Sequence, residues 1–210
     1  MNALRWGVVA AVFISLGALT FLVFKALSLK NPRFYAAPQG RAFRGVAYAL
    51  GRGLLPWEKE SARLHLAAYV GGFVYHSGIF AGFGILIVLA VGVPLSPFMW
   101  TVLRVASAAG LTAGLGLLAK RIVKSHARRL SVPDDYGANI FVDIFLAGAL
   151  AASFGPGLVP VLFGYSIFLL LYIPLGKIRH CFFFFLSRIS FGRFFGRRGA
   201  LPPLKPERER

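Results

Sequence analysis

The stretch LHLAAYVGGFVYHSGIFAGFGILIVLAVG, residues 64–92, decides the fold of this chain. It contains no Lys, Arg, Asp or Glu, and it exceeds the roughly 20 residues that a helix needs to cross a bilayer. It also contains two histidines, His65 and His76. A histidine at membrane depth is costly and indicates a function.

The composition extends this prediction to the whole chain. Of its 210 residues, 57% are hydrophobic and 15% are charged, whereas soluble domains carry about 25% charged residues. The mean hydropathy is +0.69. The sequence therefore predicts an integral membrane protein of one domain. Its single cysteine, Cys181, excludes an intrachain disulfide and any cysteine-ligated cluster within this chain.

Nearly all of the charged residues fall in three blocks, residues 25–63, 120–135 and 177–210. Uncharged turns alternate with these blocks, which is the pattern of the positive-inside rule. The net charge of +17 is thus assigned to anionic lipid at the cytoplasmic face and not to nucleic acid. We expect a multi-pass protein of the cytoplasmic (inner) membrane, with the N-terminus outside and the C-terminus in the cytoplasm.

The expected fold is an all-α bundle of five transmembrane helices within residues 1–182. The apolar run 6–24 is interpreted as a retained span, because it is longer than the core of a typical signal peptide. A basic, aromatic tail over 183–210 is expected to form an interfacial helix. The predicted spans cover about 5–27, 64–92, 99–120, 136–154 and 158–180.

Three histidines indicate a b-type haem held between two imidazoles. In a helix, His65 and His76 point the same way and differ by about 16.5 Å of rise. His180 follows at the cytoplasmic end of the fifth span, where Pro174 is expected to kink the helix. Alternatively, His65 and His180 snorkel to water and His76 bonds to a neighbouring helix. His126 is expected to be a solvated loop residue.

These histidine segments carry a family resemblance over residues 60–182. RLH (63–65), FVYH (73–76) and YIPLGKIRH (172–180) resemble the gamma subunit of respiratory nitrate reductase and its relatives in sulfur-metabolism and heterodisulfide-reductase-like complexes. The resemblance implies five spans, an outside N-terminus, and haem ligands on the second and fifth helices.

The chain departs from this family at one position. Fully equipped members have two histidines on the fifth helix, whereas here Leu162 stands about 18 residues before His180. One bis-histidine haem is therefore expected, and a second would need unusual ligation. The resemblance and the expected depth favour the pair His65–His180. The alternative pairs His76 with His180, since a tilted fifth helix could reach it.

Four further polar residues are candidates for binding haem propionates or a quinone. Arg104 either snorkels to the outer surface or binds one of these groups, as a basic residue does in the family it resembles. Asp143 either handles protons or pairs with an arginine. Lys177 and Arg179 either bind propionates or anchor the helix at the cytoplasmic surface.

The expected function is electron transfer by a haem b subunit, which is not a complete enzyme alone. It would connect the quinone pool to a cytoplasmic iron–sulfur partner, with an outer-face cytochrome subunit as a further partner. The alternative is a haem-free membrane anchor or small transporter whose histidines make interhelical hydrogen bonds. No phosphate-binding loop or nucleophile–base motif is present in the sequence.

Overall fold

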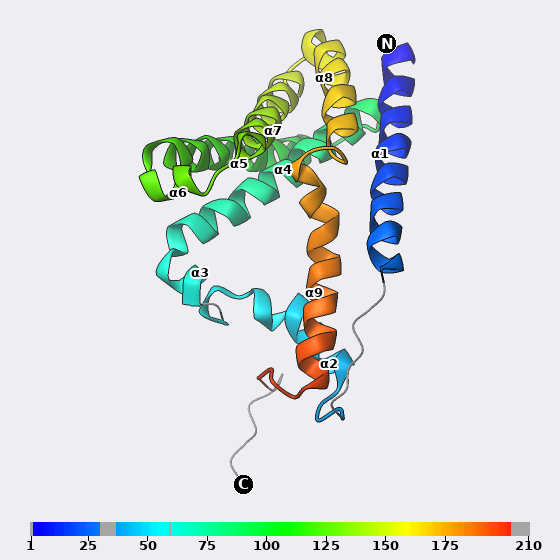
Figure 1. Ribbon diagram of the computed structural model, residues 1–210. Helices are drawn as coiled ribbons and strands as arrows, with labels where there is room; N and C mark the ends of the chain where they lie inside the picture. Colours follow the sequence, from blue (N-terminus) through cyan, green and yellow to red (C-terminus); the bar gives the residue numbers. More distant parts are fainter. Residues whose placement is uncertain (1, 30–36, 59, 203–210) are drawn as a thin grey trace. The chain divides into compact units, whose positions relative to one another are not determined.

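The computed structural model is built entirely of helices in the residues that it describes, 2–29, 37–58 and 60–202. This confirms the expected all-α class. The long helices are α1 (Asn2–Ser28), α4 (Leu66–Val91), α5 (Pro97–Val123), α7 (Pro133–Ala152), α8 (Val159–Tyr172) and α9 (His180–Arg197) (Figure 1). Shorter helices are α2 (Ala42–Leu50), α3 (Glu60–Leu64) and α6 (Ser125–Arg129), with 3₁₀ turns η1 (Arg52–Leu54), η2 (Pro56–Glu58), η3 (Pro156–Leu158) and η4 (Lys177–Arg179).

Four of these helices are long and apolar enough to cross a membrane by themselves: α1, α4, α5 and α7. The pair Pro156–Tyr172 and Lys177–Arg197 passes the same test only when its two pieces are taken together, as a broken span or a re-entrant loop. The 14 residues of α8 rise only about 21 Å, which is less than a bilayer core. The chain is thus a multi-span helical membrane protein.

Local sequence signals explain where the helices begin and end. The Ser96 side chain accepts a hydrogen bond from the Met99 amide and caps α5, which begins with Pro97. The carboxylate of Asp135 accepts from the Val132 amide at the start of α7. Gly92 ends α4 with a φ of 78°, a left-handed conformation that a glycine adopts without strain.

The chain divides into two compact units. Unit 1 comprises Met1–Ala18 and Ala67–Ile178, and unit 2 comprises Leu19–Leu66 and Arg179–Arg210. In unit 1, α7 packs against α5 and α8 (Figure 1). Its core includes the fully buried side chains of Phe145, Phe163 and Ile85. The first turns of α1 also belong here, with Gly7 close to Ile167 of α8.

Unit 2 is built around a close pair of antiparallel helices, α2 and α9 (Figure 1). Gly45 of α2 meets Gly192 and Gly196 of α9 backbone to backbone. The amides of Gln39 and Gly40 donate to the Arg197 carbonyl, at 3.0 and 2.9 Å. These bonds satisfy the carbonyl end of α9 at the point where the chain enters α2.

Two predicted spans have different bounds in the structure. The second helix begins at Leu66, and His65 lies in the turn between α3 and α4. The fifth helix ends at Tyr172, so that His180 begins α9 and the predicted interfacial tail is the continuation of that helix to Arg197. Pro174 causes this break because it cannot donate a backbone hydrogen bond. Residues 203–210 of the predicted tail lie outside the described residues.

Candidate functional site

His76 lies on the exposed face of α4, in the middle of a membrane-spanning helix. Its Nδ1 lies 2.7 Å from the Gly72 carbonyl oxygen, one turn earlier. A carbonyl oxygen only accepts, so Nδ1 is the protonated nitrogen, and in the neutral ring Nε2 carries the lone pair. Phe73 and Phe80 are 70% and 74% exposed on either side. The arrangement is an oriented imidazole between two uncovered aromatic rings.

His65 and His180 both belong to unit 2 and are both exposed. His65 donates its backbone amide to Ala62 over 3.3 Å, as part of the turn that joins α3 to α4. His180 is the first residue of α9. Figure 1 shows α3, which ends one residue before His65, away from the first turn of α9.

Leu162 occupies the position at which the resembling family has its other fifth-helix histidine. Its side chain is almost completely buried, and it packs close to Gly148 of α7. The α7–α8 core therefore fills this position with an apolar side chain. A second haem has no ligand here.

Arg104 is held by protein groups and does not extend freely to the surface. Its Nε donates to the Ser153 hydroxyl at 3.1 Å, and Nη2 donates to the Ser153 carbonyl. Its guanidinium also lies 4.4 Å from the centre of the Phe154 ring. Ser153 is the C-cap of α7, so the arginine places positive charge at the negative end of that helix.

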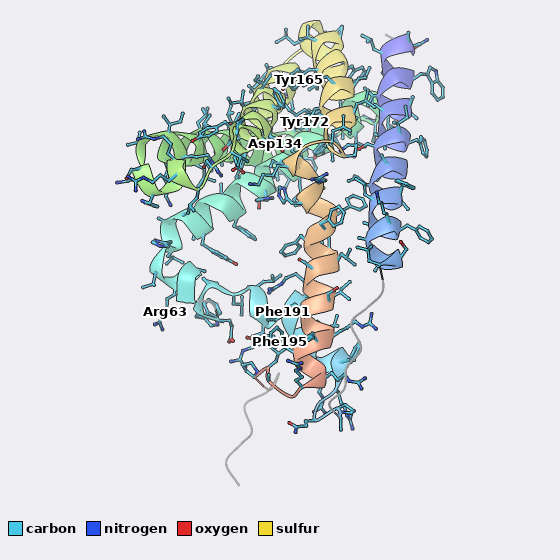
Figure 2. All side chains as sticks on the ribbon, in the orientation of Figure 1. Arg63, Asp134, Tyr165, Tyr172, Phe191 and Phe195 are labelled. Atoms are coloured by element: carbon cyan, nitrogen blue, oxygen red, sulfur yellow. The ribbon has the colours of Figure 1, made fainter. Side chains whose placement is uncertain are left out.

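Lys177 and Arg179 follow the break in the fifth span, but their environments differ. The Lys177 ammonium pairs with Asp135, which also lies 3.5 Å from Arg121. Beside this ion pair, the Tyr172 hydroxyl donates to Asp134, and Figure 2 shows the two side chains next to each other. Lys177 thus joins the broken end of α8 to the start of α7, whereas Arg179 is exposed.

Asp143 lies inside unit 1 and is paired with an amide and not with an arginine. The Asn139 Nδ2 donates to Asp143 Oδ2 at 2.9 Å and also lies 3.1 Å from the Tyr75 hydroxyl. The same Asn139 nitrogen lies 3.4 Å from the Gly114 carbonyl oxygen. Gly114 belongs to the Gly110-x-x-x-Gly114 pattern of α5, and it makes room for the Asp143 and Tyr75 side chains.

Sequence reasoning missed a polar cluster in unit 2. Arg188 of α9 donates to the carbonyls of Ala49 and Gly53, at 2.9 and 2.7 Å, and so satisfies the end of α2. Next to it, Glu58 accepts from Arg52 and Tyr48. The hydrogen bond from Arg52, followed by that from Tyr48, lowers the pKa of Glu58.

The burial of Tyr48, together with its bond to Glu58, raises the pKa of the phenol. A signal for the helix contact beneath this cluster was present in the sequence. Gly192-x-x-x-Gly196 has the spacing that permits close helix contact.

No group of three or more histidine, cysteine, aspartate or glutamate side chains that could hold a metal ion occurs among the described residues. This leaves ligation by one or two imidazoles as the metal chemistry that the predicted residues offer. Comparisons with protein-family models, with curated proteins and with solved structures found no match to the chain.

Proposed function

We propose that this protein is a haem b-binding membrane subunit of a multi-subunit redox complex. It passes electrons between the quinone pool and an iron–sulfur partner at the cytoplasmic face of the inner membrane. The resemblance of the histidine segments to nitrate reductase gamma subunits motivates this proposal. An outer-face cytochrome subunit is a further partner in the same proposal.

The observation that carries haem binding is the arrangement of His76 on α4. It supports the alternative pair His76–His180, whereas the pair His65–His180 rests on the resemblance. Haem-ligating histidines commonly donate one ring nitrogen to a carbonyl oxygen, which fixes the ring and directs the other nitrogen to the metal. His76 has this arrangement, through its bond to Gly72. His76 and its neighbours Phe73 and Phe80 are exposed on the same helix, and a flat apolar group that bears a metal fits such a surface.

The preferred axial pair in this proposal is His65 and His180, with His76 as the alternative partner of His180. Both preferred residues are exposed, and both belong to unit 2. The buried Leu162 supports a single bis-histidine haem.

The chain contributes ligands, orientation and charge to this function. When bound, the haem accepts and donates single electrons. The exposed Arg179, beside His180, supplies positive charge for a propionate. Lys177 pairs with Asp135, and Arg104 donates to Ser153. In this proposal both side chains therefore position α7.

The optical spectrum of the purified full chain tests the proposal. A reduced-minus-oxidised spectrum with the bands of a low-spin b-type haem, and haem recovered by extraction, are the expected results. A chain that contains no haem after expression with an adequate haem supply contradicts the proposal.

Single variants test the ligands. His180→Ala and His65→Ala should each remove the low-spin spectrum, whereas His76→Ala and the control His126→Ala, in the exposed helix α6, should retain it. Loss of the spectrum in His76→Ala with retention in His65→Ala would assign the pair His76–His180. Retention in His180→Ala contradicts both assignments.

A haem-free membrane anchor is the second candidate, and specific observations favour it. The Gly72 carbonyl satisfies His76 within its own helix. Two of the predicted propionate or quinone partners, Lys177 and Arg104, already have protein partners. This candidate predicts unchanged folding and expression of the His76→Leu variant, together with the absence of haem from the parent chain.

A further inference from the structure

Asp143 is the acid that lies deepest in the described part of the chain, and neither function above uses it. It stands at the eleventh of the 20 residues of α7, a helix that spans the membrane by length and composition. The residue is only 5% exposed. An acid at this place needs a counter-charge or a proton.

The described residues supply no counter-charge to Asp143. The two cations near the start of α7, Arg121 and Lys177, pair with Asp135. The group that contacts Asp143 on its own helix is the neutral amide of Asn139. From α5 it meets Gly114, and the titratable side chain that faces the same cluster from α4 is Tyr75.

The two carboxyl oxygens of Asp143 have different environments. Oδ2 accepts the 2.9 Å hydrogen bond from Asn139. Oδ1 is buried and has no hydrogen-bond partner in the described part of the structure. It lies beside Gly114, where a Cβ would collide with it. A charged, unpartnered oxygen is highly unfavourable in such surroundings, whereas a neutral hydroxyl group there costs much less.

Two further polar side chains lie on α7 between this carboxyl and the start of the helix. Asp135, Asn139 and Asp143 follow one another at intervals of four residues on α7, each about 6 Å further along the axis. Residues at this spacing lie on one side of a helix. We call these three residues the α7 polar row. Asp135 is the residue of this row nearest the start of α7, and it forms the ion pair with Lys177.

We propose that Asp143 is a proton-binding site inside the membrane, loaded along the α7 polar row. A proton from the aqueous end of α7 forms an O–H bond on Oδ1 and converts the carboxylate to a neutral carboxyl group. No electron is transferred in this step. The Asn139 amide holds Oδ2 in place by its hydrogen bond, and Asn139 is also the middle residue of the α7 polar row. The proposal does not depend on haem.

Infrared spectroscopy of the full chain in lipid bilayers tests the site. At neutral pH we expect the carbonyl stretch of a protonated carboxyl group, with a downshift in D₂O. The band should be lost in Asp143→Asn, which keeps the shape of the neutral side chain. It should be retained in Asp134→Asn, the matched control on the same helix, because Asp134 accepts from Tyr172.

A second measurement keeps the proposal falsifiable if Asp143→Asn does not fold. The chain has three aspartates, at positions 134, 135 and 143, so carboxyl-¹³C aspartate shifts the band in the unmutated protein only if an aspartate carries it. Absence of this isotope shift, or an unchanged band in Asp143→Asn, overturns the proposal. Asp143→Asn removes the carboxyl group without removing a predicted haem ligand, so this proposal and the haem proposal are tested separately.

The route has its own test. Asn139→Leu should retain the band but slow its downshift after transfer to D₂O, because the polar row is interrupted. Exchange at the same rate as in the unmutated chain contradicts loading along the row.

Discussion

Units 1 and 2 both bring helices together through glycines, but in unit 1 a neighbouring glycine also makes room for polar side chains. In unit 1, Gly78 and Gly110 let α4 and α5 meet, and the neighbouring Gly114 makes room for the polar side chains of Asp143 and Tyr75. In unit 2, Gly45 meets the glycines of α9 with no side chain between them. A missing side chain can thus admit a buried polar group or bring two backbones together.

The largest expected effect comes from adding one methyl group to the unit 2 contact. In Gly45→Ala, the new Cβ would collide with the Gly192 carbonyl and lie 2.5 Å from the Gly196 Cα. Because backbone atoms cannot turn away, the free energy of unfolding should fall by about 3 kcal/mol. Titration with SDS in mixed micelles, followed by far-ultraviolet circular dichroism, measures it.

Gly116→Ala is the matched control, because nothing lies within 4 Å of a Cβ at that position of α5. Because alanine has a higher helix propensity than glycine, Gly116→Ala should raise the free energy of unfolding by about 1 kcal/mol. Equal stabilities of the two variants would show that α2 and α9 are not in backbone contact.

A smaller loss is expected when the polar bridge of unit 1 is removed. Asn139→Leu takes away the amide that contacts Asp143, Tyr75 and Gly114. A buried carboxyl group left without its donor should lower the free energy of unfolding by about 2 kcal/mol. The exposed neighbour Ile140 provides the control, and Ile140→Ala should change the same quantity by less than half as much. An Asn139→Leu protein as stable as the parent chain would mean that unit 1 is held by apolar packing alone.

The smallest expected effect is the pH dependence of the Glu58 cluster in unit 2. Arg52 and Tyr48 bond to Glu58 and lower its pKa below the ordinary value of 4.5. A lowered pKa in the folded state contributes stability above the ordinary value, which is lost as the pH falls through the folded value. Stability should therefore decline with acidification below about pH 4.5.

Glu58→Gln should flatten this decline, and added salt should weaken it because the ion pair is at the surface. The measurement is the thermal unfolding midpoint between neutral and acidic pH. Equal acid sensitivity of the parent and variant chains would assign the decline to other carboxyl groups.

Hydropathy and breaker residues predicted most of the fold. The spans around α1, α4, α5 and α7 were located to within a few residues, because membrane insertion depends on the summed hydropathy of one segment. Pro174 likewise marked the break in the fifth span, since its missing amide acts locally. The position of His65 was the exception, because it lies in a turn although Leu64 and Leu66 flank it.

The candidate site could be predicted less well. The sequence left Asp143 between a proton-handling role and an arginine partner, and the structure gives it Asn139. The spacing of these two residues was visible in the sequence, but the approach of Tyr75 was not. Arg104 was expected at the surface or on a cofactor, and it caps α7. Tyr75 and Ser153 belong to other elements than the Asp143 cluster on α7 and Arg104 on α5, so these contacts are beyond the reach of local pattern.

The sequence by itself determined that this chain is a helical membrane protein with most of its charge in three blocks and with three of its histidines in or beside apolar segments. Hydropathy, charge and proline act within one segment, so they can be read along the chain. Only the tertiary structure decided that Gly45 meets Gly192 and that Asp143 lies beside Gly114 without a cation. Such contacts join residues far apart in sequence, and they depend on shape complementarity that no single segment contains.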